Sequence, residues 1–270
     1  MARNLRPTRP APRSAPRTAW GWAWAGALAG VLPAVVAFAP AHWLAGGVAR
    51  ATQGQVQLLQ PRGTVWTGSA QLVLTGGQAS KDSAALPGRV DWQLRPTWGG
   101  LRARLQAGCC TPEPLQAQVH LRWAGPQITL ADGQSQWPAA LLAGLGTPWN
   151  TLQPQGQLAL QTRALAVQWA AGRMVLSGQA QLDARAMSSR LSTLRPMGSY
   201  RLVLQGGEVP TLALSTLDGA LQLSGSGQWV GNRLRFAGEA SAAPEREAAL
   251  SNLLNIIGRR NGARSIITVG

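Results

Sequence analysis

The chain of 270 residues has few of the side chains on which most catalytic and metal sites depend. It contains two histidines, His42 and His120, two cysteines and only ten Asp and Glu residues. Neither histidine has a second metal ligand at helical or turn spacing, so no metal site is expected. Phosphate-loop, nucleophile-elbow and dinucleotide-binding motifs are also absent. These gaps predict a protein that is not an enzyme and holds no cofactor. A hydrolase stays open only if His120 lies beside a serine and a carboxylate.

Charged residues make up only 13% of the chain, yet the net charge is +15 and Lys81 is the single lysine. Five arginines and four prolines alternate within residues 1–18, a pattern that predicts an extended, solvated arm. A surplus of +9 follows Arg50, from 19 cations and 10 acids. An excess of arginine is typical of proteins that bind nucleic acid, anionic lipid or an acidic partner. The alternative is that these arginines are only solvated and bind nothing.

No charged residue occurs between Ala19 and Leu44. An apolar run of this length is sufficient to span a bilayer, and tryptophans lie near both of its ends. We therefore expect a transmembrane signal anchor at 19–44, with the arm at 1–18 cytoplasmic and residues 48–270 periplasmic, where nucleic acid is not an expected partner. A cleaved signal peptide is the alternative, because Ala37-Phe38-Ala39 resembles a cleavage site, but the length of the run favours the anchor.

Beyond Gly47 the pattern changes to short runs in which apolar and polar residues alternate, separated by glycine pairs. Such alternation predicts antiparallel strands with one apolar face. The runs are at residues 90–94, 101–105, 119–123, 158–160, 202–204, 212–214, 221–223 and 234–236. The fold class is therefore mainly β, a large and mostly antiparallel curved sheet, either an open groove or a sandwich.

Two segments interrupt the alternation. Residues 137–145 predict one or two helical turns, and residues 245–258 predict a C-terminal amphipathic helix with Glu245 and Glu247 in its first turn.

The adjacent Cys109 and Cys110 stand in a turn-like sequence. A structural vicinal disulfide is the preferred interpretation, while a redox element or two free thiols on opposite sides of a strand remain open.

Several motifs, in a fixed order, resemble those of the type II secretion system protein N family. They are Arg62-Gly63-Thr64-Val65-Trp66-Thr67-Gly68-Ser69-Ala70, the strand at 88–92, Gly198-Ser199-Tyr200-Arg201-Leu202, Gly225-Ser226-Gly227-Gln228-Trp229 and the segment 253–260 ending in Gly258-Arg259-Arg260. The resemblance covers residues 19 to 260. We expect Arg62, Gly63, Thr64, Trp66, Gly68, Gly198, Ser199, Tyr200, Gly227, Trp229, Gly258 and Arg259 to have structural roles, since glycine and tryptophan in strands usually serve turns and packing.

The resemblance implies a single-pass protein of the bacterial inner membrane whose periplasmic β domain supports export of folded proteins across the outer membrane. Its partners would be other inner-membrane subunits of the secretion system. The family also resembles the AsmA group of membrane-anchored groove proteins, which favours an open sheet. An alternative function is therefore a lipid-handling protein whose apolar groove carries acyl chains across the periplasm.

Overall fold

The computed structural model describes residues 20–77, 80–122, 125–170, 173–231 and 233–270. It divides the chain into two compact units, Met1–Phe38 and Ala39–Gly270. The first unit contributes one described helix, and the second contains the sheet and the remaining helices. The arginine-rich arm at 1–18 lies outside the described residues.

The apolar N-terminal run does not form one continuous helix from Ala19 to Leu44. It is divided into α1 (Trp20–Ala37) and α2 (Ala41–Ala51), with Pro40 at the N-cap of α2. Proline lacks an N–H and disfavours the helical conformation of the residue before it, which explains the break. Among the residues that the structure describes, no helix is both long enough and apolar enough to cross a membrane.

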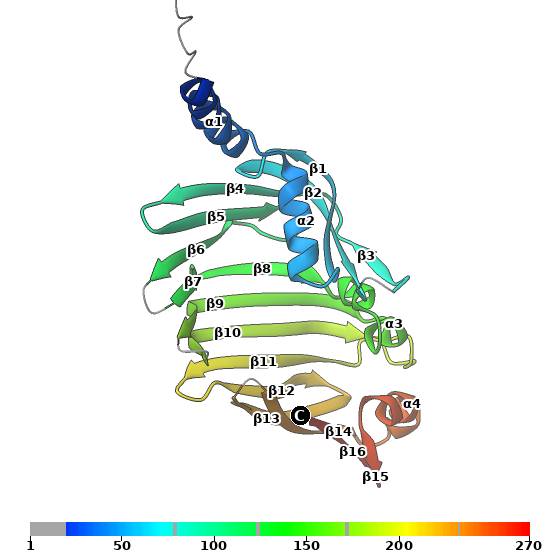
Figure 1. The fold of residues 1–270 in the computed structure, drawn as a ribbon. Coiled ribbons are helices and arrows are strands. Elements are labelled where there is room, and N and C mark those ends of the chain that lie inside the picture. The colour runs from blue at the N-terminus through cyan, green and yellow to red at the C-terminus, as the bar shows by residue number, and fades with distance from the viewer. Residues whose placement is uncertain (1–19, 78–79, 123–124, 171–172, 232) are drawn as a thin grey trace, which may run out of the picture. The chain divides into compact units, whose positions relative to one another are not determined.

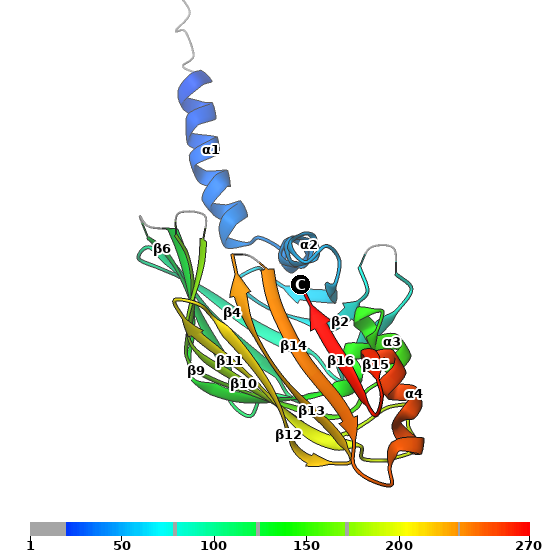
Figure 2. The same cartoon turned by 90° about the horizontal axis from the view of Figure 1, so that it is seen from below.

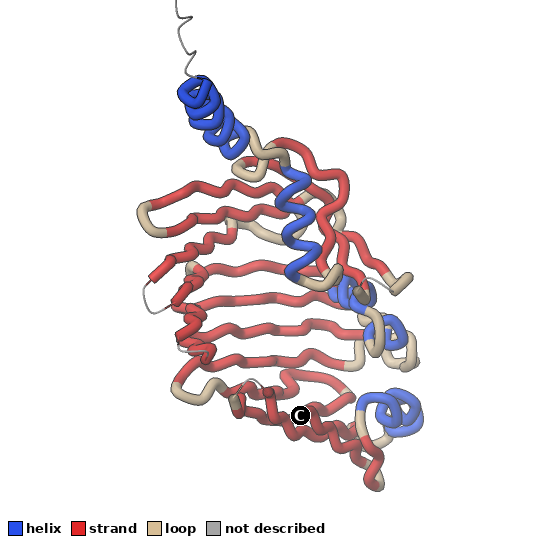
Figure 3. The backbone as a smooth tube through the Cα atoms, viewed as in Figure 1, coloured by secondary structure: helices blue, strands red, loops and turns tan. Residues whose placement is uncertain are grey.

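The second unit is built on one antiparallel sheet of 16 strands (Figures 1 and 3). The first eight strands are β1 (Val56–Gly63), β2 (Thr67–Thr75), β3 (Ser83–Ala85), β4 (Val90–Thr97), β5 (Gly100–Ala107), β6 (Leu115–Arg122), β7 (Gly125–Leu130) and β8 (Gly133–Pro138). The others are β9 (Gln155–Ala170), β10 (Arg173–Ser188), β11 (Gly198–Gly207), β12 (Thr211–Gly219), β13 (Leu221–Val230), β14 (Arg233–Ala242), β15 (Arg259–Asn261) and β16 (Arg264–Val269).

The strands follow one another across the sheet almost in chain order. The path is β1-β2-β4-β5-β6-β7-β9-β10-β11-β12-β13-β14-β16-β15, with β3 paired to β2 and β8 paired to β9. In this path β1 and β15 are the two edges, so the sheet is open, and Figure 2 shows it bent into a trough. The predicted mainly β class is confirmed, and of the two shapes that the residues left open, the open sheet is the one found.

The remaining helices are the 3₁₀ helix η1 (Ala139–Leu145), α3 (Trp149–Leu152) and α4 (Glu247–Ile257). The helix η1 confirms the helical turns predicted at 137–145, α3 was not predicted, and α4 confirms the amphipathic helix predicted at 245–258. This helix is not the C-terminal element, however, because β15 and β16 follow it. The β-branched run Ile266-Ile267-Thr268-Val269 is the signal for a last strand, and the prediction missed it.

The helices of the second unit pack on one face of the sheet, here named the inner face. Near β1, α2 places the buried Ala41 against Ala70 and Trp92. At the other side of the sheet, α4 inserts Leu250, Leu253 and Leu254 against Leu221, Tyr200 and other residues of β11–β14. Burial of three leucines contributes several kcal/mol, at about 2 kcal/mol each. Packing by α4 therefore anchors the last strands of the sheet.

Candidate functional site

The inner face of β9–β13 carries apolar side chains at alternate positions, as the sequence pattern predicts. Beneath α3 and α4 these side chains do not fill the space completely. They leave a cavity of about 330 Å³ whose lining includes Leu152, Leu158, Leu182, Leu214, Leu253 and Ile257. This volume lies at the lower end of the range for small-molecule sites. The alternation predicts an apolar face, but the cavity depends on how α3 and α4 cover it.

The ring of Tyr200 lines this cavity, but no polar atom of the described residues contributes to the cavity surface, so the Tyr200 hydroxyl lies behind the wall. The residue is only 7% exposed, and its Oη has no hydrogen-bond partner within the described part of the chain. Burial raises the pKa of Tyr200, so the phenol stays protonated and keeps a proton to donate. A buried hydroxyl without a partner is costly, by about 1–3 kcal/mol. The cavity thus offers only apolar walls, and one hydroxyl without a partner among the described residues lies buried behind them.

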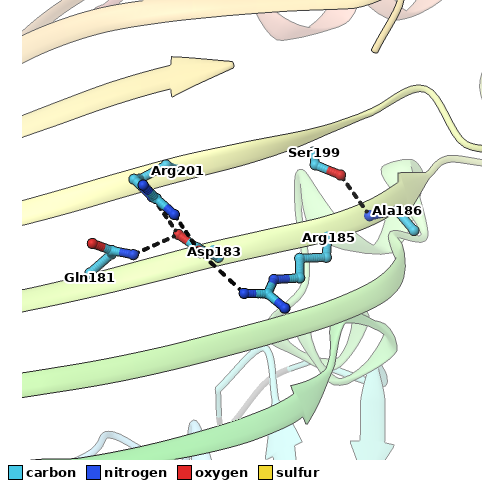
Figure 4. Close-up of polar contacts among 6 residues, drawn as sticks. All are labelled: Gln181, Asp183, Arg185, Ala186, Ser199 and Arg201. Carbon is cyan, nitrogen blue, oxygen red and sulfur yellow. Dashed lines mark hydrogen bonds and ion pairs between the residues drawn. The ribbon is translucent and has the colours of Figure 1, made fainter. Parts of the chain in front are cut away.

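Gly198 makes room for this hydroxyl. A Cβ atom on Gly198 would lie 2.8 Å from Tyr200 Oη and 2.6 Å from the carbonyl oxygen of Asp218. Ser199, the residue between them, accepts a hydrogen bond on its Oγ from the backbone N–H of Ala186 at 3.1 Å (Figure 4). Two motif residues therefore shape the cavity wall and join β10 to β11, and Tyr200 itself lies in the wall.

A polar cluster occupies the opposite, outer face of β10 and β11 (Figure 4). Asp183 is only 3% exposed and accepts two hydrogen bonds from Arg201, Nε to Oδ1 and Nη2 to Oδ2, each 2.8 Å long. Gln181 Nε2 donates to Asp183 Oδ1 at 3.1 Å, and Arg185 Nη2 lies 3.5 Å from Oδ2. The hydrogen bonds from Arg201 hold the pKa of Asp183 below its usual value.

This cluster is a saturated ion pair that ties neighbouring strands in register, since Asp183 and Arg201 are direct partners across β10 and β11. A carboxylate already bonded to three side chains is poorly placed to take up a proton in a reaction. Sequence reasoning missed it. The one available signal was a carboxylate at Asp183 within an otherwise apolar alternation, but its partner is 18 residues away.

The motif at 62–70 forms the β1–β2 hairpin and is also structural. Gly63 has a φ of +86°, in the left-handed region that glycine adopts without strain. Gly68 faces the indole of Trp92, where an added Cβ would lie 2.6 Å from Trp92 Cζ2. The Trp92 Nε1–H donates to the carbonyl of Val65 at 3.0 Å. The hairpin is therefore shaped to seat one buried tryptophan.

The remaining residues of this motif also make local contacts. Thr64 accepts a hydrogen bond on its Oγ1 from the backbone N–H of Thr67 at 3.1 Å. The carbonyl of Trp66 accepts from the N–H of Leu94 at 2.7 Å, which joins the turn to β4. Arg62 pairs with Ser69 across the hairpin.

The last motif residues lie in β13 and at the start of β15. Gly227 packs against Phe236 of β14, where an added Cβ would lie 3.0 Å from Phe236 Cβ. The N–H of Trp229 donates to the carbonyl of Pro210 at 3.0 Å. Gly258 follows α4 in an extended conformation, and Arg259 is exposed in β15. The motifs thus lie at separate places along the sheet and do not converge on one site.

Cys109 and Cys110 are joined by a vicinal disulfide in the loop between β5 and β6, with their Cα atoms 3.7 Å apart. Cys110 is 4% exposed and packs with Leu86, Ala107 and Leu141. Cys110 therefore belongs to a small apolar core. Bonding in the cell stays a prediction, which alkylation of the native protein without reductant will test.

His120 lies on β6, where its Nε2 is 3.2 Å from Gln118 Oε1. No serine or carboxylate is recorded as a contact of His120 among the described residues, and no three His, Cys, Asp or Glu side chains of that part of the chain form a group suited to a metal ion. The hydrolase alternative therefore gains no support from the geometry.

A family model matches residues 54–267, and its description is type II secretion system (T2SS), protein N. The match spans nearly the whole sheet, from the residues before β1 to β16. No curated protein and no solved structure matches the chain.

Proposed function

Because this chain belongs to the type II secretion system protein N family, we propose that it is a non-enzymatic component of that system. Its β domain would support export of folded proteins across the outer membrane by contacting other subunits. We also propose a bacterial inner-membrane location, with the arm at 1–18 cytoplasmic, the apolar segment at 19–44 as anchor and residues 48–270 periplasmic. The asymmetry of arginine around the apolar segment supports this topology.

The open edge of the sheet supports a function based on protein contacts. β15 pairs only with Arg264–Ile266 of β16, so among the described strands the outer edge of β16 is uncovered from Ile267 onward. Val269 is 52% exposed there. An uncovered edge can accept a strand from a partner through backbone hydrogen bonds. We propose this edge as a contact for a partner subunit.

The test combines export with recovery of partners. Deletion of the protein is expected to lower secretion of the exported proteins, and the tagged full chain is expected to recover inner-membrane secretion subunits. Val269→Lys should reduce that recovery, because a lysine blocks strand addition at an edge. Ile256→Lys, on an exposed position of α4, is the matched control and should leave recovery unchanged. Normal export after deletion, with no subunit recovered, would contradict the proposal.

The apolar cavity supports lipid handling as a second candidate function. Its walls are entirely apolar, which suits the methylene groups of an acyl chain. Mass spectrometry of the full chain purified from membranes would detect such a ligand. Leu214→Trp should expel it by filling the cavity, whereas Leu217→Trp, on the same strand and 45% exposed at present, should not. Absence of acyl chains from the parent protein would count against this candidate.

A further inference from the structure

Five hairpin turns lie at the same end of the sheet. Every strand on the path runs antiparallel to its neighbour, so the strand ends at β4–β5, β6–β7, β9–β10, β11–β12 and β13–β14 share one end of the sheet, and Figure 1 shows the β4–β5 and β11–β12 turns on the left. Two neighbouring pairs of these ends are bonded to each other. The N–H of Leu121 donates to the carbonyl of Gly99 at 2.8 Å, and that of Trp229 to Pro210 at 3.0 Å.

At each of these places an exposed apolar side chain lies in the turn or at the strand end beside it, and we name the five residues the turn rim. They are Trp98, Leu121, Trp169, Val209 and Val230. Trp98 is 104% exposed and Leu121 is 72% exposed, which is unusual for such large apolar groups. A single exposed apolar residue needs no explanation, but a row of five on adjacent turns marks an interaction surface.

The charge around the turn rim has one predominant sign. Within three residues of the turns or of the rim, the sequence places Arg95, Arg102, Arg122, Arg173, Arg233 and Arg235, and of the ten carboxylates in the chain only Glu208. Of the described side chains, Arg95, Arg102, Arg233 and Arg235 are exposed. Exposed tryptophan with surrounding arginine suits the interface of an anionic bilayer, where the indole lies at headgroup level and the guanidinium groups meet phosphate.

The chain also enters the sheet at this end. Ala39, the first residue of the second unit, accepts a hydrogen bond from the N–H of Val65 in the β1–β2 turn at 2.8 Å. The β1–β2 turn lies at the same end as the turn rim, because β2 is antiparallel to β4. Ala39, the residue at which the second unit begins, therefore lies at the end of the sheet that carries the rim.

We propose that the turn rim docks onto the surface of a bilayer that contains anionic lipid. Trp98 and Trp169 enter the interface, and the arginines around them bind headgroup phosphates. The trough then opens toward the membrane at its turn end. Docking of this kind would serve subunit assembly or lipid handling equally, so it goes beyond the secretion function.

A depth measurement tests the docking. A nitroxide label at Val209→Cys, in the full chain reconstituted into vesicles of phosphatidylcholine and phosphatidylglycerol, should be accessible to oxygen and shielded from a water-soluble nickel chelate. A label at Lys81→Cys, which is exposed in the β2–β3 connection, should be accessible to the chelate. Labelling of the parent chain shows whether Cys109 and Cys110 contribute any signal.

The charge dependence identifies the partner. Arg95→Gln/Arg102→Gln should lower the ratio of docked to undocked chains roughly 30-fold, because each arginine near an anionic surface contributes a factor of about five. Arg259→Gln/Arg260→Gln, in β15, removes the same charge elsewhere and should leave the ratio unchanged. If the label at position 209 were accessible to the nickel chelate in the anionic vesicles, the proposal would be overturned. Equal shielding in phosphatidylcholine alone and in the Arg95/Arg102 variant would also overturn it, because the docking would then not depend on anionic lipid.

Discussion

The two ends of the sheet handle the same kind of apolar side chain in opposite ways. At the end covered by η1, α3 and α4, leucines of the inner face are buried or partly buried, and Leu254 of α4 is 0% exposed. At the turn end, Trp98 and Leu121 lie in solvent. Strand alternation alone does not decide between a core and a docking surface. What decides is whether another element of the chain lies over the strand end.

The largest expected effect lies at the covered end. Leu254→Ala should lower the free energy of unfolding by about 3–4 kcal/mol, because it leaves a void in the packed core between α4 and the sheet. Leu121→Ala at the turn end should change it by less than about 0.5 kcal/mol. Denaturant unfolding of the full chain in detergent measures both. Equal losses would show that the two ends do not differ as described.

A glycine substitution probes the part of the turn end that α2 does cover. Gly68→Ala should cost about 2 kcal/mol, because its Cβ would overlap the indole of Trp92, which is 2% exposed. Gly108→Ala is the control, since a Cβ there meets no atom within 4 Å. A stability of Gly68→Ala equal to that of the control, in thermal unfolding, would mean that this hairpin is not packed.

The Asp183–Arg201 ion pair tests whether contacts on the outer face of the sheet also stabilise the fold. Asp183→Asn should cost about 1–2 kcal/mol at neutral pH, through loss of the charged hydrogen bonds to Arg201. The folded-state pKa of Asp183 is lowered, so its stabilisation is present above the unfolded pKa of about 3.9 and is lost as pH falls through the folded value.

Unfolding measured as a function of pH separates this carboxylate from the others. Below about pH 4 the parent should lose stability more steeply than Asp183→Asn. Parallel curves for the two proteins would show that the Asp183–Arg201 pair does not contribute to folding.

A smaller effect of opposite sign is expected in the cavity. Tyr200→Phe should raise the stability of the ligand-free chain by about 1 kcal/mol, because it removes a buried hydroxyl without a partner. The measurement is the shift in unfolding midpoint after lipid extraction. A loss of stability instead would mean that the hydroxyl is already satisfied in solution.

The smallest effect is expected at the disulfide. Reduction of Cys109–Cys110 should change stability by less than about 1 kcal/mol, because a bond between adjacent residues closes almost no loop in the unfolded chain. Mass spectrometry after alkylation without reductant should leave both cysteines unlabelled. Labelling of both thiols would show that the bond is absent.

Much of the sheet could be predicted because its information is local. Runs such as Val90–Leu94 and Leu202–Leu204 alternate with period two, and they appear as parts of β4 and β11. The helix α4 was likewise recognised from its spacing of leucines. Pro33 and Pro40 in the apolar run predict a kink or an early end, and α1 does end before Pro40. The strands after α4 were missed, because β15 and β16 gain their stability from pairing with each other and with β14.

The candidate sites could be predicted less well, because they depend on distant residues. Tyr200 was selected from a motif and expected to be structural, yet its hydroxyl lies buried without a partner among the described residues, behind an apolar cavity wall. Asp183 was not selected at all, since its importance arises only when β10 meets β11 in register. Trp98 carries no sequence signal for exposure, because an alternating strand with glycines after it suits a buried tryptophan equally well.

The sequence by itself determined the class of the fold, the alternation of apolar and polar faces and the separation of an arginine-rich N-terminus from the β domain. It also carried the ordered motifs of the secretion family. Tertiary structure alone decided that the sheet is open, that a cavity lies beneath α4 and that five turns carry exposed apolar groups at one end. The physical reason is that periodicity depends on neighbours in the chain, whereas coverage of a face depends on which distant element packs against it.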